Sequence, residues 1–132
     1  MNWKLIFLLS MFGLAMGVAT VFVIPSKIEP VFWLVILCIC AYIIAKQAPD
    51  QPFVHGLLVG ILNSVWITAA HVLLFDTYIA NHAREAEAMQ SVPLSPRLMM
   101  VVTGPIVGVL SGLVLGLVAL LVRKLVNRPA TA

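Results

Sequence analysis

The side chains that could do chemistry within this apolar chain are concentrated between residues 63 and 82. An amide, two hydroxyls and an imidazole are followed by an acid, a phenol and a second imidazole; these residues are Asn63, Ser64, Thr68, His71, Asp76, Tyr78 and His82. On a helix, Asn63, Ile67, His71, Tyr78 and His82 share one stripe with Gly56 and Gly60. Polar groups at membrane depth face the bundle or a water-filled cavity. We therefore expect a polar pocket or proton-responsive path from Asn63 past His71 to the surface near Asp76 and His82, because histidine changes charge near neutral pH.

Two other interpretations of these polar residues remain open. In the first, Asn63, Ser64 and Thr68 hydrogen-bond to neighbouring helices, and His71 stays neutral near the membrane interface. In the second, His82 and Glu85 bind a metal ion together with His71 or Asp76. Two such ligands on a solvated helix often occur by chance, and the sequence shows no second ligand-bearing helix. We therefore predict no metal site and no cofactor.

The sequence also lacks the motifs that membrane enzymes usually carry. It contains no nucleophile elbow, phosphate loop, paired intramembrane carboxylates or His/Cys cluster. This favours a non-enzymatic membrane protein, a helix-packing or accessory module. One alternative is a small oligomeric transporter or channel lined by Asn63 and His71, although all five acidic residues lie at helix ends or in loops. A further alternative is a metal-dependent membrane enzyme.

Composition and hydropathy define the elements that must position these residues. Hydrophobic residues make up 62% of the chain and charged residues 10%, far from the roughly 45–50% and 25% of soluble domains. Apolar runs cover Leu5–Ile24, Val31–Ala45, Phe53–Phe75 and Leu98–Val122, and about 20 helical residues cross a bilayer core. We predict an all-α integral membrane protein, a single domain over residues 1–132 with four transmembrane helices in an up-down bundle. The first run exceeds the length of a signal peptide's apolar region, so we expect it to stay uncleaved.

Prolines bracket the predicted connections between the helices. The pairs are Pro25/Pro30, Pro49/Pro52 and Pro93/Pro96, which gives helices over about 3–24, 30–47, 52–90 and 96–126. Because no breaker lies between Pro52 and Pro93, we predict that the third helix extends beyond the membrane to residue 90, with its membrane part at 53–75. Such a helix would be about 58 Å long.

All eight glycines are spaced four residues apart within the apolar runs. They form the pairs Gly13/Gly17 and Gly56/Gly60 and the series Gly104/Gly108/Gly112/Gly116. Inside a helix each glycine costs about 0.5–1 kcal/mol relative to alanine, but in lipid it supplies a flat groove for close backbone approach. We predict glycine-rich (GxxxG) packing faces that receive a helix of the same chain or of another copy. The expected partners are the lipid bilayer and either a homo-oligomer or another membrane protein.

The basic residues predict the orientation of the chain. Lys4, Lys46, Arg123, Lys124 and Arg128 lie on one side of the predicted membrane, and Lys27, Arg84 and Arg97 on the other. Because basic residues favour the cytoplasmic face, we predict that both termini are cytoplasmic in an inner or plasma membrane. The basic residues are scattered over helix ends without an aromatic-basic patch, so nucleic acid is not an expected partner.

Overall fold

The computed structural model describes residues 1–128, which contain helices and no strand. The helices are α1 (Trp3–Phe22), α2 (Glu29–Gln47), α3 (Pro52–Leu73), α4 (Phe75–Asn81), α5 (Ala83–Gln90) and α6 (Pro96–Val126). Four of them, α1, α2, α3 and α6, are long and apolar enough to cross a membrane. The prediction of four helices long and apolar enough to cross a membrane is therefore confirmed, and these helices support a membrane-embedded protein.

The helix starts follow from local sequence. The Asn2 side chain caps α1 by accepting a hydrogen bond from the Leu5 N–H at 3.1 Å, and Ser95 caps α6 through the Leu98 N–H at 3.2 Å. A proline stands in the first turn of α2, α3 and α6. Proline suits this position because its missing N–H would have no partner within the helix.

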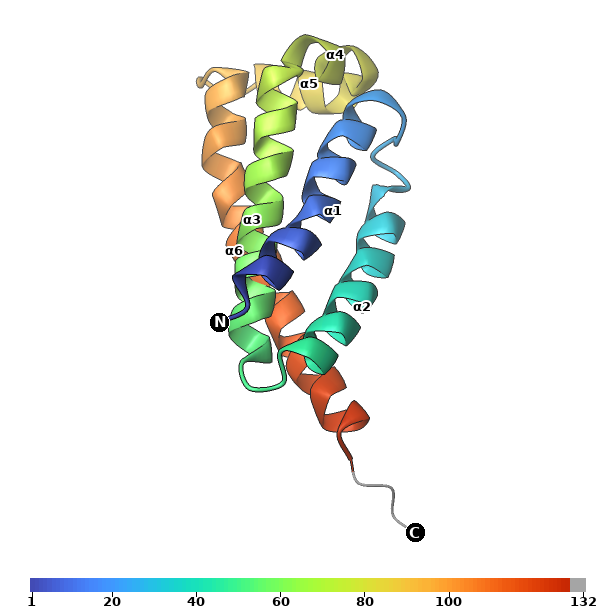
Figure 1. Ribbon diagram of the computed structural model, residues 1–132. Helices are drawn as coiled ribbons and strands as arrows, with labels where there is room; N and C mark the ends of the chain where they lie inside the picture. Colours follow the sequence, from blue (N-terminus) through green and yellow to red (C-terminus); the bar gives the residue numbers. More distant parts are fainter. Residues whose placement is uncertain (129–132) are drawn as a thin grey trace.

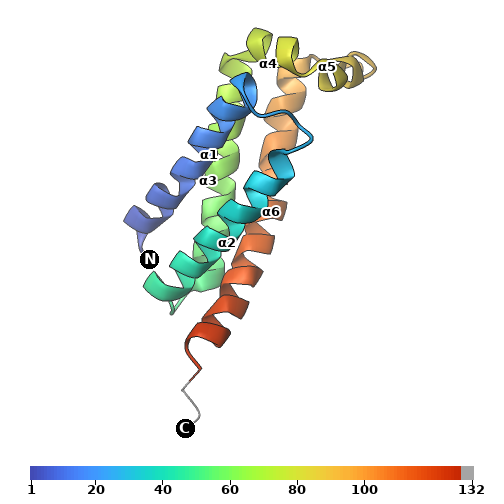
Figure 2. The same cartoon turned by 90° about the vertical axis from the view of Figure 1, so that its right-hand side faces the viewer.

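Helix α3 lies between α1 and α6, and α2 packs mainly against α6 (Figures 1 and 2). The start of α1 and the end of α6 lie at the end of the bundle opposite α4 and α5 (Figure 1). The buried residues of α2 are confined to the part of the helix after Leu34: they are Ile36, Cys40, Ala41, Ile44 and Ala45. The first two turns of α2 therefore contain no fully buried residue, although the half-buried Trp33 packs against the core.

The third helix is shorter than predicted. It ends at Leu73, and the backbone leaves helical geometry at Leu74 (φ −104°, ψ 31°) and His82 (φ −131°, ψ 65°), so the prediction of one helix over 52–90 is wrong. The segment is helical, but it folds as α4 and α5 across the end of the bundle (Figure 2). Asn81 Nδ2 donates to the Val21 carbonyl at the end of α1, at 2.7 Å. A straight extension would carry Asn81 away from this carbonyl and into water.

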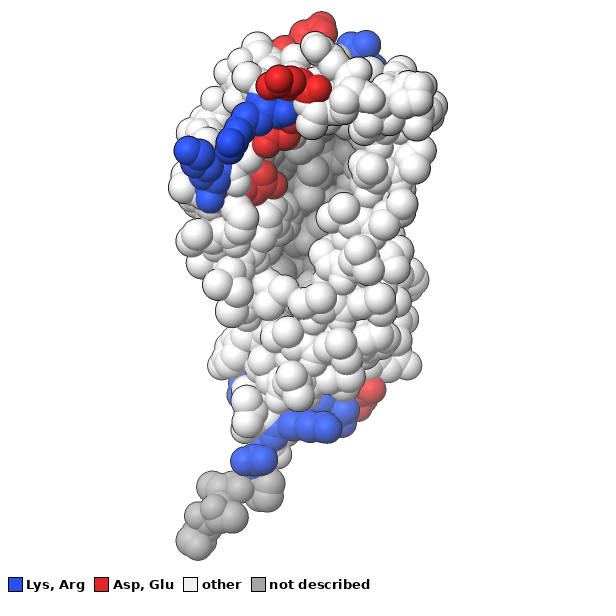
Figure 3. All heavy atoms as spheres, turned by 180° about the vertical axis from the view of Figure 1, so that it is seen from behind, with Lys and Arg blue, Asp and Glu red and all other residues white. Residues whose placement is uncertain are grey.

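Charged residues gather at the two ends of the molecule, and a belt without Lys, Arg, Asp or Glu separates them on the face seen in Figure 3. This face is hollowed below the outer group of charges, the group on the side of α4 and α5 (Figure 3). The charge-free belt matches the apolar interior of a bilayer.

Each glycine faces another helix of the same chain at close range. A Cβ added to Gly56 would lie 2.6 Å from the Gly116 Cα, and one added to Gly60 would collide with the Gly112 Cα. On the other side of α3, a Cβ on Gly13 would lie 2.5 Å from the Asn63 Cα. Real Cβ atoms do not approach backbone so closely, so alanine could not replace these glycines without moving a helix.

The prediction of close backbone approach along the glycine series of α6 needs a correction at Gly108 and Gly104. The nearest atoms to a Cβ added to Gly108 belong to the Ser64 side chain, and this Cβ would collide with the Ser64 hydroxyl rather than with backbone. Gly104 faces the Thr68 side chain in the same way. The reason is that the side chains of Ser64 and Thr68 of α3 point at these two positions, while the Gly60 carbonyl oxygen lies farther off, 3.5 Å from the Cβ added to Gly108. Gly104 and Gly108 therefore make room for two hydroxyl side chains, whereas Gly112 and Gly116 make the closest backbone contacts with α3.

Candidate functional site

The Asn63 amide lies between α1 and α3. Its Oδ1 accepts a hydrogen bond from the Gly13 N–H at 2.9 Å, and both groups are buried. The contact is possible because Gly13 has no side chain between its backbone and α3. Asn63 therefore ties two helices together at a depth where an unpaired amide would be costly.

His71 links α3 to α1 and to the short helix α4. Its Nε2 lies 2.8 Å from Thr20 Oγ1, which is also 2.8 Å from the Met16 carbonyl oxygen. Both contacts are satisfied when the His71 Nε2–H donates to the hydroxyl and the hydroxyl donates to the carbonyl. The His71 ring also stacks on Tyr78, and Tyr78 stacks on His82, with centroid separations of 4.4 and 4.2 Å.

His82 lies at the junction of α4 and α5 and is 4% exposed. Its Nδ1–H donates to the Tyr78 carbonyl at 3.0 Å, while its buried Nε2 has no hydrogen-bond partner among residues 1–128. Nearby, a hydrogen bond from Ser26 lowers the pKa of the Glu85 carboxyl. The outer end of the bundle is therefore held by contacts among α3, α4, α5 and the loop after α1.

Tyr78 gives this outer cluster a pH dependence. Burial, followed by repulsion from the Glu85 and Glu29 carboxylates, raises the pKa of Tyr78 to about 12, above the value of about 10 for an unfolded chain. The neutral phenol is favoured in the folded state. Its contribution to stability is therefore complete below about pH 10 and is lost as the pH rises through about 12.

Absorbance titration at 295 nm of a Tyr42→Phe variant isolates the Tyr78 phenol, because the sequence contains two tyrosines. We expect ionisation near pH 12 in the folded protein and near pH 10 in guanidinium. The same midpoint in both solvents would contradict the buried position of the phenol.

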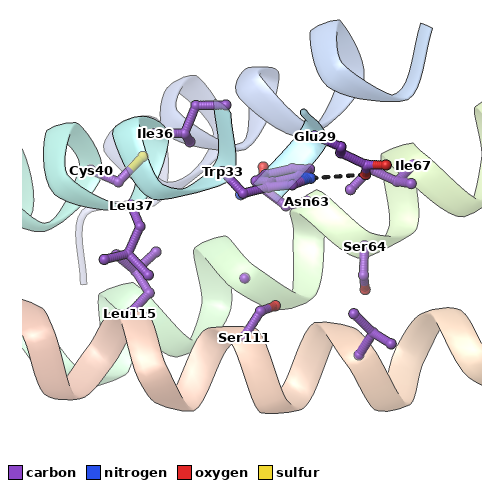
Figure 4. Close-up of a pocket in the computed structure, with 12 residues that line it drawn as sticks. Glu29, Trp33, Ile36, Leu37, Cys40, Asn63, Ser64, Ile67, Ser111 and Leu115 are labelled. Atoms are coloured by element: carbon purple, nitrogen blue, oxygen red, sulfur yellow. Dashed lines mark hydrogen bonds between the residues drawn. The ribbon is translucent and has the colours of Figure 1, made fainter. Parts of the chain in front are cut away.

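A groove lies between the first half of α2 and the helices α3 and α6. We call it the lateral groove: it is lined by α2, α3 and α6, extends from Glu29 and Trp33 to Cys40 and Leu115, and has a volume of about 260 Å³. Figure 4 shows Glu29 and Trp33 at one end and Leu37 and Leu115 toward the other. The Trp33 Nε1–H donates to Glu29 Oε1 at 3.1 Å. The lateral groove is therefore a largely apolar groove with a carboxylate and an indole at the end nearest α4 and α5.

The structure distributes the polar residues singled out from the sequence over separate places. Asn63 and Ser64 line the lateral groove, and Thr68 lies against Gly104 of α6. His71, Tyr78 and His82 form the ring stack, whereas the exposed Asp76 pairs with Arg97 at 3.8 Å. The stack forms although α3 and α4 are separate helices, because α4 folds back over the outer end of the bundle.

Two features of the structure were not predicted from the sequence. Glu29 reads as an ordinary acid at a helix end, yet it lines the lateral groove. His55, 3% exposed, accepts a hydrogen bond at Nε2 from the Asn2 N–H at 3.0 Å, and its Nδ1–H donates to the Gln51 carbonyl at 2.7 Å. In the sequence, the one sign of this contact is that a histidine stands in the first turn of an otherwise apolar helix, near the level at which the N-terminal residues begin α1.

Residues 1–128 contain no group of three or more His, Cys, Asp or Glu residues placed to hold a metal ion. Comparison of the chain with protein-family models, curated proteins and solved structures found no match. The function must therefore be inferred from the residues and their geometry.

Proposed function

We propose that this protein is a non-enzymatic integral membrane protein, a helix-packing or accessory module that assembles with a second copy of itself or with another membrane protein. The observation that carries the proposal is the use of the polar groups of α3 between helices. Asn63 bonds to the Gly13 backbone, and His71 bonds to Thr20. These groups stabilise contacts between helices, which is the role expected of polar side chains in a packing module.

The glycine ladders support the same proposal. Gly56 and Gly60 of α3 lie against Gly116 and Gly112 of α6, and Gly13 lies against Asn63. We infer that these are GxxxG-type packing faces and that they hold α1, α3 and α6 together in an up-down bundle. Since these faces are occupied within the chain, assembly with a partner would use the outward surface of α6, where Leu110 and Leu117 are exposed.

The orientation follows from the charges as a further part of the proposal. Lys4, Lys46, Arg123 and Lys124 belong to the end where α1 begins and α6 finishes, and Arg84 and Arg97 to the opposite end. By the preference of basic residues for the cytoplasm, the termini would be cytoplasmic. The segment α4–α5 would then be extracytoplasmic.

Disulfide cross-linking in membranes tests the assembly surface. In a chain with Cys38→Ser and Cys40→Ala, we expect Leu117→Cys to form a cross-linked dimer on oxidation, because it lies on the proposed outward face of α6. Leu8→Cys on α1, which is at least as exposed as Leu117, is the control and should stay monomeric. Equal cross-linking at both positions would indicate random collision and would overturn a specific interface on α6.

A second candidate function is a small transporter or channel, and the lateral groove is the observation that favours it. Asn63 and Ser64 line this groove at membrane depth, and Glu29 lies at its outer end. A pathway along the groove predicts that a cysteine placed at Ile67, which also lines it, reacts with a water-soluble thiol reagent. It also predicts a flux that is lost in Glu29→Gln, because this carboxylate lines the outer end of the groove. Protection of the cysteine together with unchanged flux would exclude this candidate.

A further inference from the structure

The outer end of the lateral groove combines a carboxylate with an aromatic ring. The Trp33 indole donates its N–H to Glu29 Oε1, which holds the two side chains side by side. This bond uses one of the two carboxylate oxygens, so the second remains able to meet a cation. A carboxylate beside an indole is a suitable arrangement for an organic cation, because tryptophan is the aromatic side chain that attracts ammonium groups most strongly.

The rest of the lateral groove is suited to an apolar body. Beyond Trp33, its wall is made largely of aliphatic side chains, including Leu37, Val107 and Leu115, and its floor includes Gly60 and Ser64. The groove therefore lies between α2 and α6, with α3 at its base. Figure 4 shows this space running along the helices, away from Glu29.

The charges of the lateral groove decide between possible occupants. Glu29 is the one acid among the residues that line it, and no Lys, Arg or His belongs to this lining. A phospholipid headgroup with a phosphate would find no basic partner there, whereas a simple cation would find the carboxylate. The volume of about 260 Å³ lies near the lower end of small-molecule pockets, which start at about 300 Å³. This size favours one tail rather than two.

We propose that the lateral groove binds a single-tailed lipophilic quaternary ammonium ion, with its head between Glu29 and Trp33 and its tail along Leu37 and Leu115. Neither the assembly surface on α6 nor a transport pathway is needed for this binding. The cation enters from the side, where the first two turns of α2 carry no buried residue. Figure 3 shows this open side as the hollow below the outer charges.

The test uses the full chain in phosphatidylcholine nanodiscs and radiolabelled dodecyltrimethylammonium, with binding to empty nanodiscs subtracted. We expect saturable binding to the native chain. Glu29→Gln keeps the shape of the side chain and removes its charge, and should weaken binding by about tenfold. Trp33→Leu should weaken it by about fivefold.

Two controls separate this site from other effects. Glu87→Gln removes the charge of an exposed acid on α5 outside the lateral groove, and should leave the affinity unchanged. Ser111→Phe fills the groove from α6 while retaining Glu29, and should abolish binding. Each variant is compared by size-exclusion chromatography so that a loss of binding is scored only in folded protein.

The neutral analogue of the probe, in which carbon replaces the ammonium nitrogen, separates charge recognition from simple partition into an apolar space. Its binding should not change in Glu29→Gln. The proposal is overturned if the folded native chain shows no saturable binding of the cation. It is equally overturned if Glu29→Gln and Glu87→Gln bind the cation alike.

Discussion

Gly60→Ala and Gly112→Ala are each expected to destabilise the folded protein by about 3 kcal/mol. At this crossing of α3 and α6, the added Cβ of Gly60 would collide with the Gly112 backbone, and that of Gly112 would lie 2.5 Å from the Leu57 carbonyl oxygen. The obstacle is backbone rather than a flexible side chain. The helices must therefore separate, and the contacts along their shared surface weaken together.

Reversible unfolding in mixed detergent micelles, titrated with a denaturing detergent, measures this loss. Val109→Ile is the matched control, because it adds one carbon to an exposed position of α6, and should change stability by less than about 0.5 kcal/mol. Gly17→Ala should be milder than Gly60→Ala, since its Cβ would meet Ile67 and Ala70 at 3.1 Å. Equal stability of Gly60→Ala and the native chain would show that α3 and α6 do not touch as described.

The second large effect is expected for Asn63→Leu, which should lower the free energy of unfolding by about 2–3 kcal/mol. The substitution removes the acceptor that α3 offers to the Gly13 N–H, in addition to the one within α1, and places branched carbon where Oδ1 now contacts the α1 backbone. Asn63→Ala removes the hydrogen bond without the added bulk. It should cost about 1 kcal/mol, the usual scale of hydrogen bonds between membrane helices.

Amide hydrogen exchange at Gly13 checks this prediction at the bond itself. Exchange should accelerate in Asn63→Ala relative to the native chain, because the amide loses its contact with α3. Ser64→Ala is the control: its hydroxyl donates to the Ile61 carbonyl within α3, so exchange at Gly13 should not change. Unaltered exchange in Asn63→Ala would argue against the hydrogen bond between Asn63 and Gly13.

The sequence predicts the membrane helices well because their signals are local. The apolar runs define α1, α2, α3 and α6, and the prolines define the starts of three of them. Backbone hydrogen bonds must be satisfied inside a bilayer, so a long apolar run has few alternatives to a helix. The same reasoning fails after Leu73, where the chain meets water and helix propensity alone does not fix its direction.

The candidate site was less predictable because it depends on which helices meet. The sequence marks Asn63 and His71 as inward-facing polar residues, but not that Gly13 and Thr20 of α1 are their partners. Likewise, Glu29 is an ordinary helix-end acid in the sequence. It becomes part of the lateral groove because α2 lies beside α3 and α6 with no buried residue in its first two turns.

The glycine series of α6 shows the same limit. Its spacing is visible in the sequence, but the spacing does not tell that Gly108 meets the Ser64 side chain while Gly112 meets the backbone of Leu57. This difference is decided by the register of α3 against α6. The register depends on both helix surfaces and cannot be obtained from one of them.

The sequence by itself thus determined four apolar helices long enough to cross a membrane, the four-residue spacing of the glycines and the polar residues on the third long helix. The tertiary structure decided that the glycine series of α6 meets α3, that α4 and α5 fold over the outer end, and that a groove opens beside α2. A hydrophobic run is a property of one continuous segment, so each membrane helix can be predicted from its own residues. Helix contacts arise between residues some fifty positions apart, such as Gly13 and Asn63, and depend on the shapes of both surfaces at once.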